Sequence, residues 1–244
     1  MAHYDPATGS VVARIVYDGL GFAGKTSMLR KVHELFTLAR VGEVVTPTEA
    51  KGRTLYFDWL ELRAGMIGDH PLQVHLLSVP GQWVYAQRRW LLLHESDAIV
   101  TVVDSTPEGV ARGQLGLRFL KEVLVSFGPD APPLLIQANK QDLPGALRAE
   151  ELRQTMNIGP EIPIYETVVP TGEGVRAMLV RSLQMARERI LSRLDGRPLT
   201  ELPPLLQGPE EIYEAMRSAE TERGDNLEGE LLAEQVLEAL EPES

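Results

Sequence analysis

A glycine-rich segment near the N-terminus has the residue types and spacing that hold a polyphosphate. It reads Gly19-Leu20-Gly21-Phe22-Ala23-Gly24-Lys25-Thr26, which matches the phosphate-loop pattern. The glycines allow backbone N–H groups to surround phosphates, Lys25 supplies a positive charge, and the hydroxyl of Thr26 can bind Mg²⁺. We therefore expect residues 19–27, which end at Ser27, to bind a nucleotide. The loop alone leaves ATP and GTP, kinases and switches, all open.

A second polar segment follows an apolar stretch much later in the chain. Asn139, Lys140, Gln141 and Asp142 come directly after the apolar residues 134–138. A carboxylate can accept hydrogen bonds from the two adjacent N–H groups that guanine offers and adenine does not, so Asp142 is predicted to bind guanine. Asn139 can tie this segment to the phosphate loop, and the aliphatic stem of Lys140 can cover a face of the base. The two motifs together favour a GTP-binding protein over a P-loop kinase or ATPase.

An alternating α/β framework would bring the two motifs together. Apolar β-branched runs predict six strands, at residues 11–17, 54–62, 72–79, 98–104, 134–138 and 164–168. Segments of helical period predict five helices, at residues 24–39, 84–94, 109–127, 150–156 and 174–194. This order predicts a P-loop NTPase fold, in which helices flank a mostly parallel six-stranded sheet and ligands bind at the carboxyl ends of strands. Only a turn-rich segment separates the second and third strands, so one strand is expected to be antiparallel.

The charge of the chain is concentrated at its C-terminal end. The 244 residues include 35 acidic and 24 basic side chains, a formal charge of −11, but residues 195–244 hold 14 of the acidic residues and three arginines. Residues 1–194 are therefore formally neutral. We expect an acidic extension at 195–244 with two short amphipathic helices. An acidic chain is not expected to bind nucleic acid.

The composition also excludes several kinds of anchor and site. The chain has no cysteine, which excludes disulfides, thiolate metal sites and prenyl or palmitoyl anchors. Ala2 follows Met1 and excludes myristoylation, so no lipid anchor is expected. The N-terminal residues do not form a signal peptide, and no apolar run approaches the ~18 residues that span a bilayer. A cytoplasmic location is therefore expected.

Residues 11–194 resemble the Ras-like small GTPases, and within them the bacterial MglA family, which governs cell polarity and gliding motility. The closer resemblance rests on residues 53–58 (Arg-Thr-Leu-Tyr-Phe-Asp), 79–82 (Val-Pro-Gly-Gln) and 170–175 (Pro-Thr-Gly-Glu-Gly-Val). It implies a Ras-like GTPase domain at 1–194 that hydrolyses GTP to GDP and phosphate, slowly without an activating protein. It also implies a Roadblock-type GTPase-activating protein and an effector protein that binds the GTP form as partners.

The resemblance also assigns roles to individual residues. Gln82 would orient the attacking water, Arg53 would stabilise the charge of the transition state from within the same chain, and Lys25 would act on the phosphates. Gly81 is expected among the nucleotide-binding residues. Val168, Val169 and Pro170 stand where Ras proteins carry Ser-Ala-Lys, so contact with the base there would come from backbone N–H groups.

The metal site departs from the general pattern of Ras-like proteins. Ser78 stands where those proteins carry the aspartate of Asp-x-x-Gly, and the MglA family usually has threonine there. Asp58, on the neighbouring hairpin strand, could supply the missing carboxylate. Thr26, Thr54 and Asp58 are therefore the expected Mg²⁺ ligands. The missing aspartate also leaves open a second function, a scaffold that keeps GTP bound without useful turnover.

Overall fold

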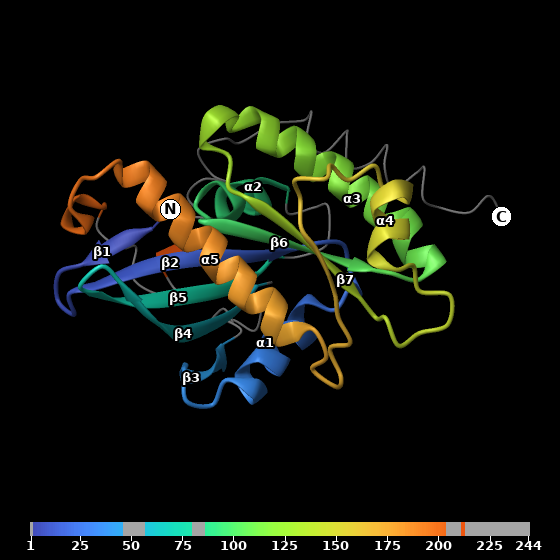
Figure 1. Ribbon diagram of the computed structural model, residues 1–244, viewed down its shortest axis with the longest axis horizontal. Coiled ribbons are helices and arrows are strands. Elements are labelled where there is room, and N and C mark those ends of the chain that lie inside the picture. The colour runs from blue at the N-terminus through green and yellow to red at the C-terminus, as the bar shows by residue number, and fades with distance from the viewer. Residues whose placement is uncertain (1, 46–56, 80–85, 204–210, 213–244) are drawn as a thin grey trace, which may run out of the picture.

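The computed structural model describes residues 2–45, 57–79, 86–203 and 211–212, and shows one mixed sheet with helices on both faces (Figure 1). The strands are β1 (His3–Asp5), β2 (Ser10–Asp18), β3 (Arg40–Val45), β4 (Asp58–Ile67), β5 (His70–Ser78), β6 (Ala98–Asp104), β7 (Leu134–Asn139) and β8 (Ile164–Glu166). The helices are α1 (Lys25–Leu35), α2 (Ala86–His94), α3 (Pro107–Ser126), α4 (Ala149–Thr155) and α5 (Val175–Leu194), with 3₁₀ turns η2 (Gly128–Asp130) and η3 (Leu199–Glu201). The predicted α/β alternation is confirmed.

The sheet has two strands more than the six predicted. Its order is β3-β4-β5-β2-β6-β7-β8, and β1 pairs with the beginning of β2. Within the described residues β4 and β1 both run against the other strands, where one antiparallel strand was expected. The short β1 and the partly exposed edge strand β3, which contains Gly42, lack the apolar alternation that marks a strand in sequence.

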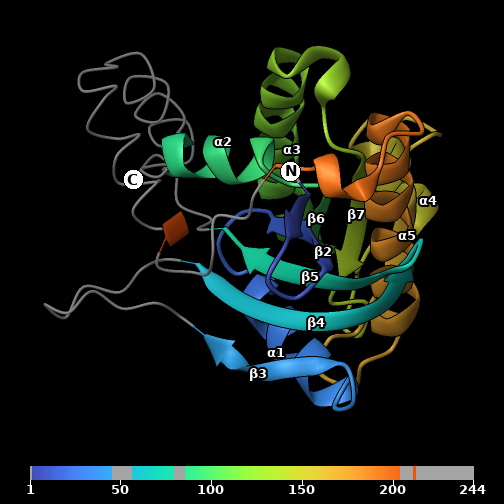
Figure 2. The same cartoon turned by 90° about the vertical axis from the view of Figure 1, so that its left-hand side faces the viewer.

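Two apolar cores lie on opposite faces of the sheet (Figure 2). Helices α1 and α5 cover one face, where they contribute residues such as Met28 and Leu179. Helices α2 and α3 cover the other face, where Leu93 and Leu117 are buried. Successive side chains of a strand point to opposite faces, so Val16 and Asp18 at the end of β2 both point to the side of α2 and α3.

The chain continues against the body beyond the end of α5. The carbonyl of Pro203 accepts a hydrogen bond from the N–H of Tyr4 at 3.1 Å, and Leu202 packs on the core beneath α5. Ile212 is also buried, in the apolar cluster of the α2 and α3 face. The two helices predicted for the acidic extension fall almost wholly outside the described residues. Of the helices in the described ranges, none is long and apolar enough to cross a membrane.

Candidate nucleotide-binding site

Four parallel strands end in polar residues at one edge of the sheet. Strands β2, β5, β6 and β7 end at Asp18, Ser78, Asp104 and Asn139. Helix α1 begins at the same edge, because the phosphate loop connects it to β2. Ligands of open α/β sheets bind outside the carboxyl ends of strands, so this edge is the candidate site.

The phosphate loop contains positions that only glycine fits. Gly24 precedes α1 with φ 105°, and a Cβ there would lie 2.5 Å from Nδ2 of Asn139. At Gly19, φ is 133° and a Cβ would overlap the carbonyl of Val102. Phe22 has a left-handed backbone (φ 64°) and is 87% exposed. The loop therefore follows the path of a phosphate cradle, with its backbone packed against β6 and β7.

Lys25 lies inside this loop. Its Nζ donates to the carbonyl of Gly19 at 2.5 Å and to that of Leu20 at 2.9 Å. Burial lowers the pKa of Lys25 to about 8, and the nearby carboxylate of Asp18 acts in the opposite direction. A bound phosphate would favour the charged form, which suits a lysine that neutralises a polyphosphate. Ser27, the next predicted residue after Thr26, is exposed in the first turn of α1.

A chain of hydroxyl and carboxylate groups lies beside the loop. The hydroxyl of Thr26 donates to Oδ2 of Asp58 at 2.6 Å, and the hydroxyl of Ser78 donates to the same oxygen at 2.8 Å. The N–H of Asp58 donates to Oγ of Ser78 at 3.1 Å, since the two residues are directly paired across β4 and β5. Hard oxygen ligands of this kind fit Mg²⁺. Within the described residues no group of three or more His, Asp or Glu side chains could hold a metal ion by itself.

Asn139 joins the predicted guanine-binding segment, residues 139–142 (the guanine motif), to the phosphate loop. Its Nδ2 donates to the carbonyl of Ala23 at 2.9 Å. Thr167, just after β8, donates from its hydroxyl to Oδ1 of Asn139 at 3.1 Å and accepts from Nε2 of Gln137 at 3.0 Å. All three polar side chains are buried, so this network fixes the distance between the two motifs.

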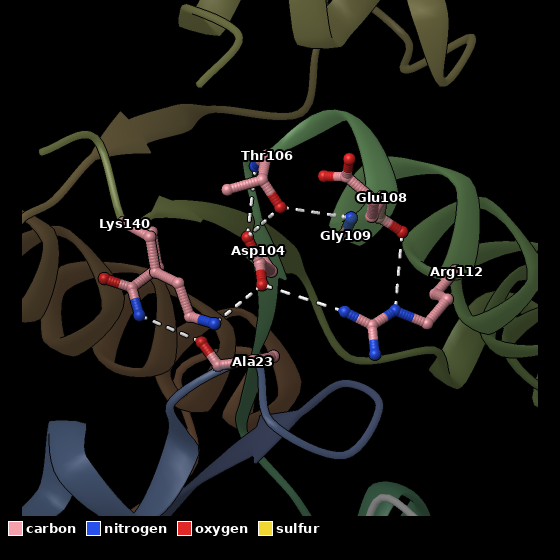
Figure 3. Close-up of polar contacts among 8 residues, drawn as sticks. Ala23, Asp104, Thr106, Glu108, Gly109, Arg112 and Lys140 are labelled. Atoms are coloured by element: carbon pink, nitrogen blue, oxygen red, sulfur yellow. Dashed lines mark hydrogen bonds and ion pairs between the residues drawn. The ribbon is translucent and has the colours of Figure 1, made fainter. Parts of the chain in front are cut away.

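Lys140 is anchored by Asp104 at the end of β6 (Figure 3). Its Nζ lies 2.6 Å from Oδ2 of Asp104, and the N–H and hydroxyl of Thr106 donate to Oδ1 at 3.0 and 2.8 Å. Partial burial raises the pKa of Asp104, but the hydrogen bonds from Lys140 and Thr106 outweigh it and lower the pKa below its usual value. Asp104 is therefore ionised and holds the stem of Lys140 in place. Asp142 is exposed two residues further on.

The remaining predicted site residues are only partly described. Arg53, Thr54, Gly81 and Gln82 lie outside the described residues. The N–H of Val168 is already donated to the carbonyl of Glu173. Pro170 has no N–H, so the expected backbone contact with the base would have to come from Val169 or the residues after Pro170.

Two acidic residues of this edge were not predicted from the sequence. Asp18 and Asp104 each end an apolar strand, and that position was the available signal. Asp104 supports the guanine motif through Lys140, and Asp18 forms a buried ion pair with Arg89 of α2. Both contacts join residues more than 30 positions apart in the sequence.

Known proteins are similar to this chain over most of its length. The sequence profile of the ADP-ribosylation factor family matches residues 7–185. The mutual gliding-motility protein MglA of Myxococcus xanthus is 36% identical over 177 residues, which are 72% of this chain and 90% of that protein. ADP-ribosylation factor-like protein 1 of Saccharomyces cerevisiae is 33% identical over 153 residues, 59% of this chain and 69% of that protein.

The chain therefore belongs to the ADP-ribosylation factor family, and its fold is that of a P-loop GTPase, as predicted. Members of this class bind GTP and GDP, typically with Mg²⁺. Within the class this is a GTP-binding small GTPase of the MglA type, which confirms the expected resemblance to the MglA family.

Proposed function

We propose that this protein is a molecular switch that hydrolyses GTP to GDP and phosphate and binds an effector protein in its GTP form. The hydrogen bond from Asn139 to the carbonyl of Ala23 carries the proposal. It holds the guanine motif and the phosphate loop at a fixed separation, so that one guanine nucleotide can contact both. The strands β2 and β7 that lead into the two motifs are not direct neighbours, since β6 lies between them, so this hydrogen bond is a direct link between the two loops.

Each residue of the site would have its own role in hydrolysis. Residues 19–27 would surround the phosphates, and Lys25 would neutralise their charge. Gln82 would hold the water whose oxygen forms a bond to the γ-phosphorus as the bond to the β,γ-bridging oxygen breaks. Arg53 would stabilise the negative charge that develops in this step. Thr26, Thr54 and Asp58 would hold Mg²⁺, which neutralises phosphate charge when it is bound.

Single-turnover hydrolysis tests this proposal. Wild-type protein loaded with GTP is expected to release stoichiometric phosphate. Gln82→Ala and Arg53→Ala should slow the release about a hundredfold or more while GTP stays bound, because each removes a group that acts in the transition state. Gln154→Ala, an exposed position on α4, is the matched control and should not change the rate.

The alternative function is a scaffold that retains GTP without useful turnover. Ser78 favours it, because an aspartate that supports Mg²⁺ in Ras-like proteins is missing at this position. Tight binding of GTP with no phosphate release from wild-type protein would establish the scaffold and contradict the hydrolase. A release that depends on Gln82 would contradict the scaffold.

We further propose that the switch acts in bacterial cell polarity or motility, in the cytoplasm, with a Roadblock-type GTPase-activating protein. The similarity to the gliding-motility protein MglA supports this role.

We also propose that residues 195–244 form an acidic extension that is anchored on the α2 face of the GTPase domain by Ile212. This residue is 3% exposed and belongs to the apolar cluster that contains Leu93 and Leu117. Ile212→Asp should therefore lower the free energy of unfolding by about 2 kcal/mol, because a charge would replace a buried side chain. Leu38→Asp, at a position that is 98% exposed, is the control for the same kind of change. Equal stability of the two variants in urea unfolding would argue against an anchored extension.

A further inference from the structure

A buried ion pair joins α2 to the strand that leads into the phosphate loop. The guanidinium of Arg89 places Nε 2.6 Å from Oδ1 of Asp18 and Nη2 2.7 Å from Oδ2. Both side chains are buried, Asp18 completely. The Nη2 contact is a hydrogen bond, whereas the Nε contact is a close ionic contact without hydrogen-bond geometry. The two contacts (the fork) join one guanidinium to one carboxylate and so restrict the relative orientation of both groups. The pair therefore sets the position of α2 against the end of β2.

The positions of the two residues in the chain connect the pair to the site. Asp18 directly precedes Gly19, the first glycine of the phosphate loop, and Arg89 lies on the helix that follows Gln82. Phe119 of α3 packs against the guanidinium, with 4.9 Å between Cζ and the centre of the ring. A displacement of α2 would thus disturb contacts with both the sheet and α3.

Stability alone does not account for such a pair. Removing two charges from water costs free energy that their attraction often only balances, and apolar residues of similar volume can be equally stable in the same place. What the two short contacts do provide is one defined position of Arg89 relative to Asp18. In this protein that position relates the helix after Gln82 to the loop that would hold the phosphates.

The charges of the pair also act on Lys25. Asp18 directly precedes Gly19, whose carbonyl accepts a hydrogen bond from Nζ of Lys25 at 2.5 Å, and Arg89 lies against Asp18. Both partners are therefore within electrostatic reach of the ammonium group in the loop. With Arg89 in place their fields at the loop largely cancel, whereas Asp18 alone would put a negative charge beside a site that must attract phosphates.

We propose that Arg89 is a positioning residue for GTP hydrolysis: its two contacts with Asp18 hold α2 against the phosphate loop, and its charge neutralises Asp18 beside that loop. The inference rests on the proposed function, since it concerns the same hydrolysis. It predicts two separable effects. Loss of the charge weakens nucleotide binding, and loss of the fork slows hydrolysis.

The charge effect is tested by the dissociation constant for a fluorescent methylanthraniloyl derivative of GTP. Arg89→Met should raise this constant about tenfold or more, because it removes the positive charge that balances Asp18 beside the phosphates. The double variant Asp18→Asn/Arg89→Met carries neither charge and should bind within about twofold of the wild type. Arg118→Met, at an exposed position of α3, is the matched control and should bind like the wild type.

The positioning effect is tested by single-turnover hydrolysis of saturating GTP. The double variant should bind normally but release phosphate at least tenfold more slowly, because displacements of about 1 Å in a catalytic group have effects of this size or larger. Arg89→Lys keeps the charge and loses the fork, so it should also bind normally and hydrolyse slowly. A purely structural role would not separate affinity from rate in this way.

Several outcomes would overturn the inference. One is an Arg89→Met protein with wild-type affinity and rate, and another is a double variant that binds no better than Arg89→Met. If Arg89→Met does not fold, as thermal unfolding would reveal, a double variant with the wild-type rate would equally contradict the positioning role. Failure of the wild-type protein to hydrolyse GTP would instead contradict the proposed function.

Discussion

Replacing Asp142 by asparagine is expected to lower the affinity for GTP about a hundredfold or more. The carboxylate can accept hydrogen bonds from both N1–H and the exocyclic N–H of guanine. An asparagine amide has one oxygen and one NH₂ group, so one donor of the base would face another donor. A site built to pair a polar group discriminates strongly when the pairing is lost.

The surroundings of Asp142 make this prediction specific. Its neighbour Gln141 is held by a hydrogen bond from its N–H to the carbonyl of Thr167 and by another from Nε2 to the carbonyl of Leu147. Lys140 is anchored on Asp104. In the described part of the chain no hydrogen bond or ion pair engages the carboxylate of Asp142, which is therefore available to a base.

Xanthosine triphosphate provides the control for Asp142→Asn. Xanthine presents N1–H beside a carbonyl oxygen, which complements an amide, so the variant should bind this nucleotide more tightly than the wild type does. Competition against fluorescent GTP measures both affinities on the same protein. Unchanged affinity for GTP would contradict the proposed role of Asp142. An equal loss of affinity for GTP and for xanthosine triphosphate would show that the loop had lost its structure.

The class of the fold and the two motifs were predictable because they depend on local patterns. The phosphate loop has a fixed spacing between β2 and α1, and Asn139 follows an apolar run that is buried throughout. Strand β3 was not predictable in the same way. Its residues are half-buried or exposed at the edge of the sheet, so burial places no alternating apolar pattern on them.

The side-chain contacts that hold the site residues in place were less predictable, because they depend on packing between distant elements. That Asp58 lies near Ser78 could be inferred, since a short turn joins the two strands. Their direct pairing could not, because an irregularity between Arg63 and Met66 shifts the register by one residue. The pairing of Arg89 with Asp18 could not be inferred either. A single arginine on α2 and a single aspartate at the end of β2 meet only once α2 has packed on the sheet. Asp104 and Lys140 are a similar case, because they meet through the neighbouring strands β6 and β7.

Asp58→Asn is expected to raise the concentration of Mg²⁺ needed for tight GTP binding about tenfold to a hundredfold. Asp58 accepts hydrogen bonds from the hydroxyls of both Thr26 and Ser78. Because the proton of the Thr26 hydroxyl points to Asp58, the lone pairs of its oxygen are left for a cation. The carboxylate also supplies the negative charge that Ser78 cannot. Asparagine preserves the size and one acceptor but removes the charge, and changes to groups that orient metal ligands have effects of this size.

Titration of nucleotide retention with Mg²⁺ measures the effect directly. In excess EDTA the variant should release fluorescent GDP no faster than the wild type, because without the cation the carboxylate of Asp58 can only repel the phosphates. Asp69→Asn, in the exposed turn between β4 and β5, makes the same chemical change away from the site and should leave the titration unaltered. If Asp58→Asn retains nucleotide at the same Mg²⁺ concentration as the wild type, Asp58 is not part of the metal site. Faster release by Asp58→Asn in EDTA as well as in Mg²⁺ would assign the residue to the structure of the loop, through its hydrogen bond with Thr26, and not to the cation.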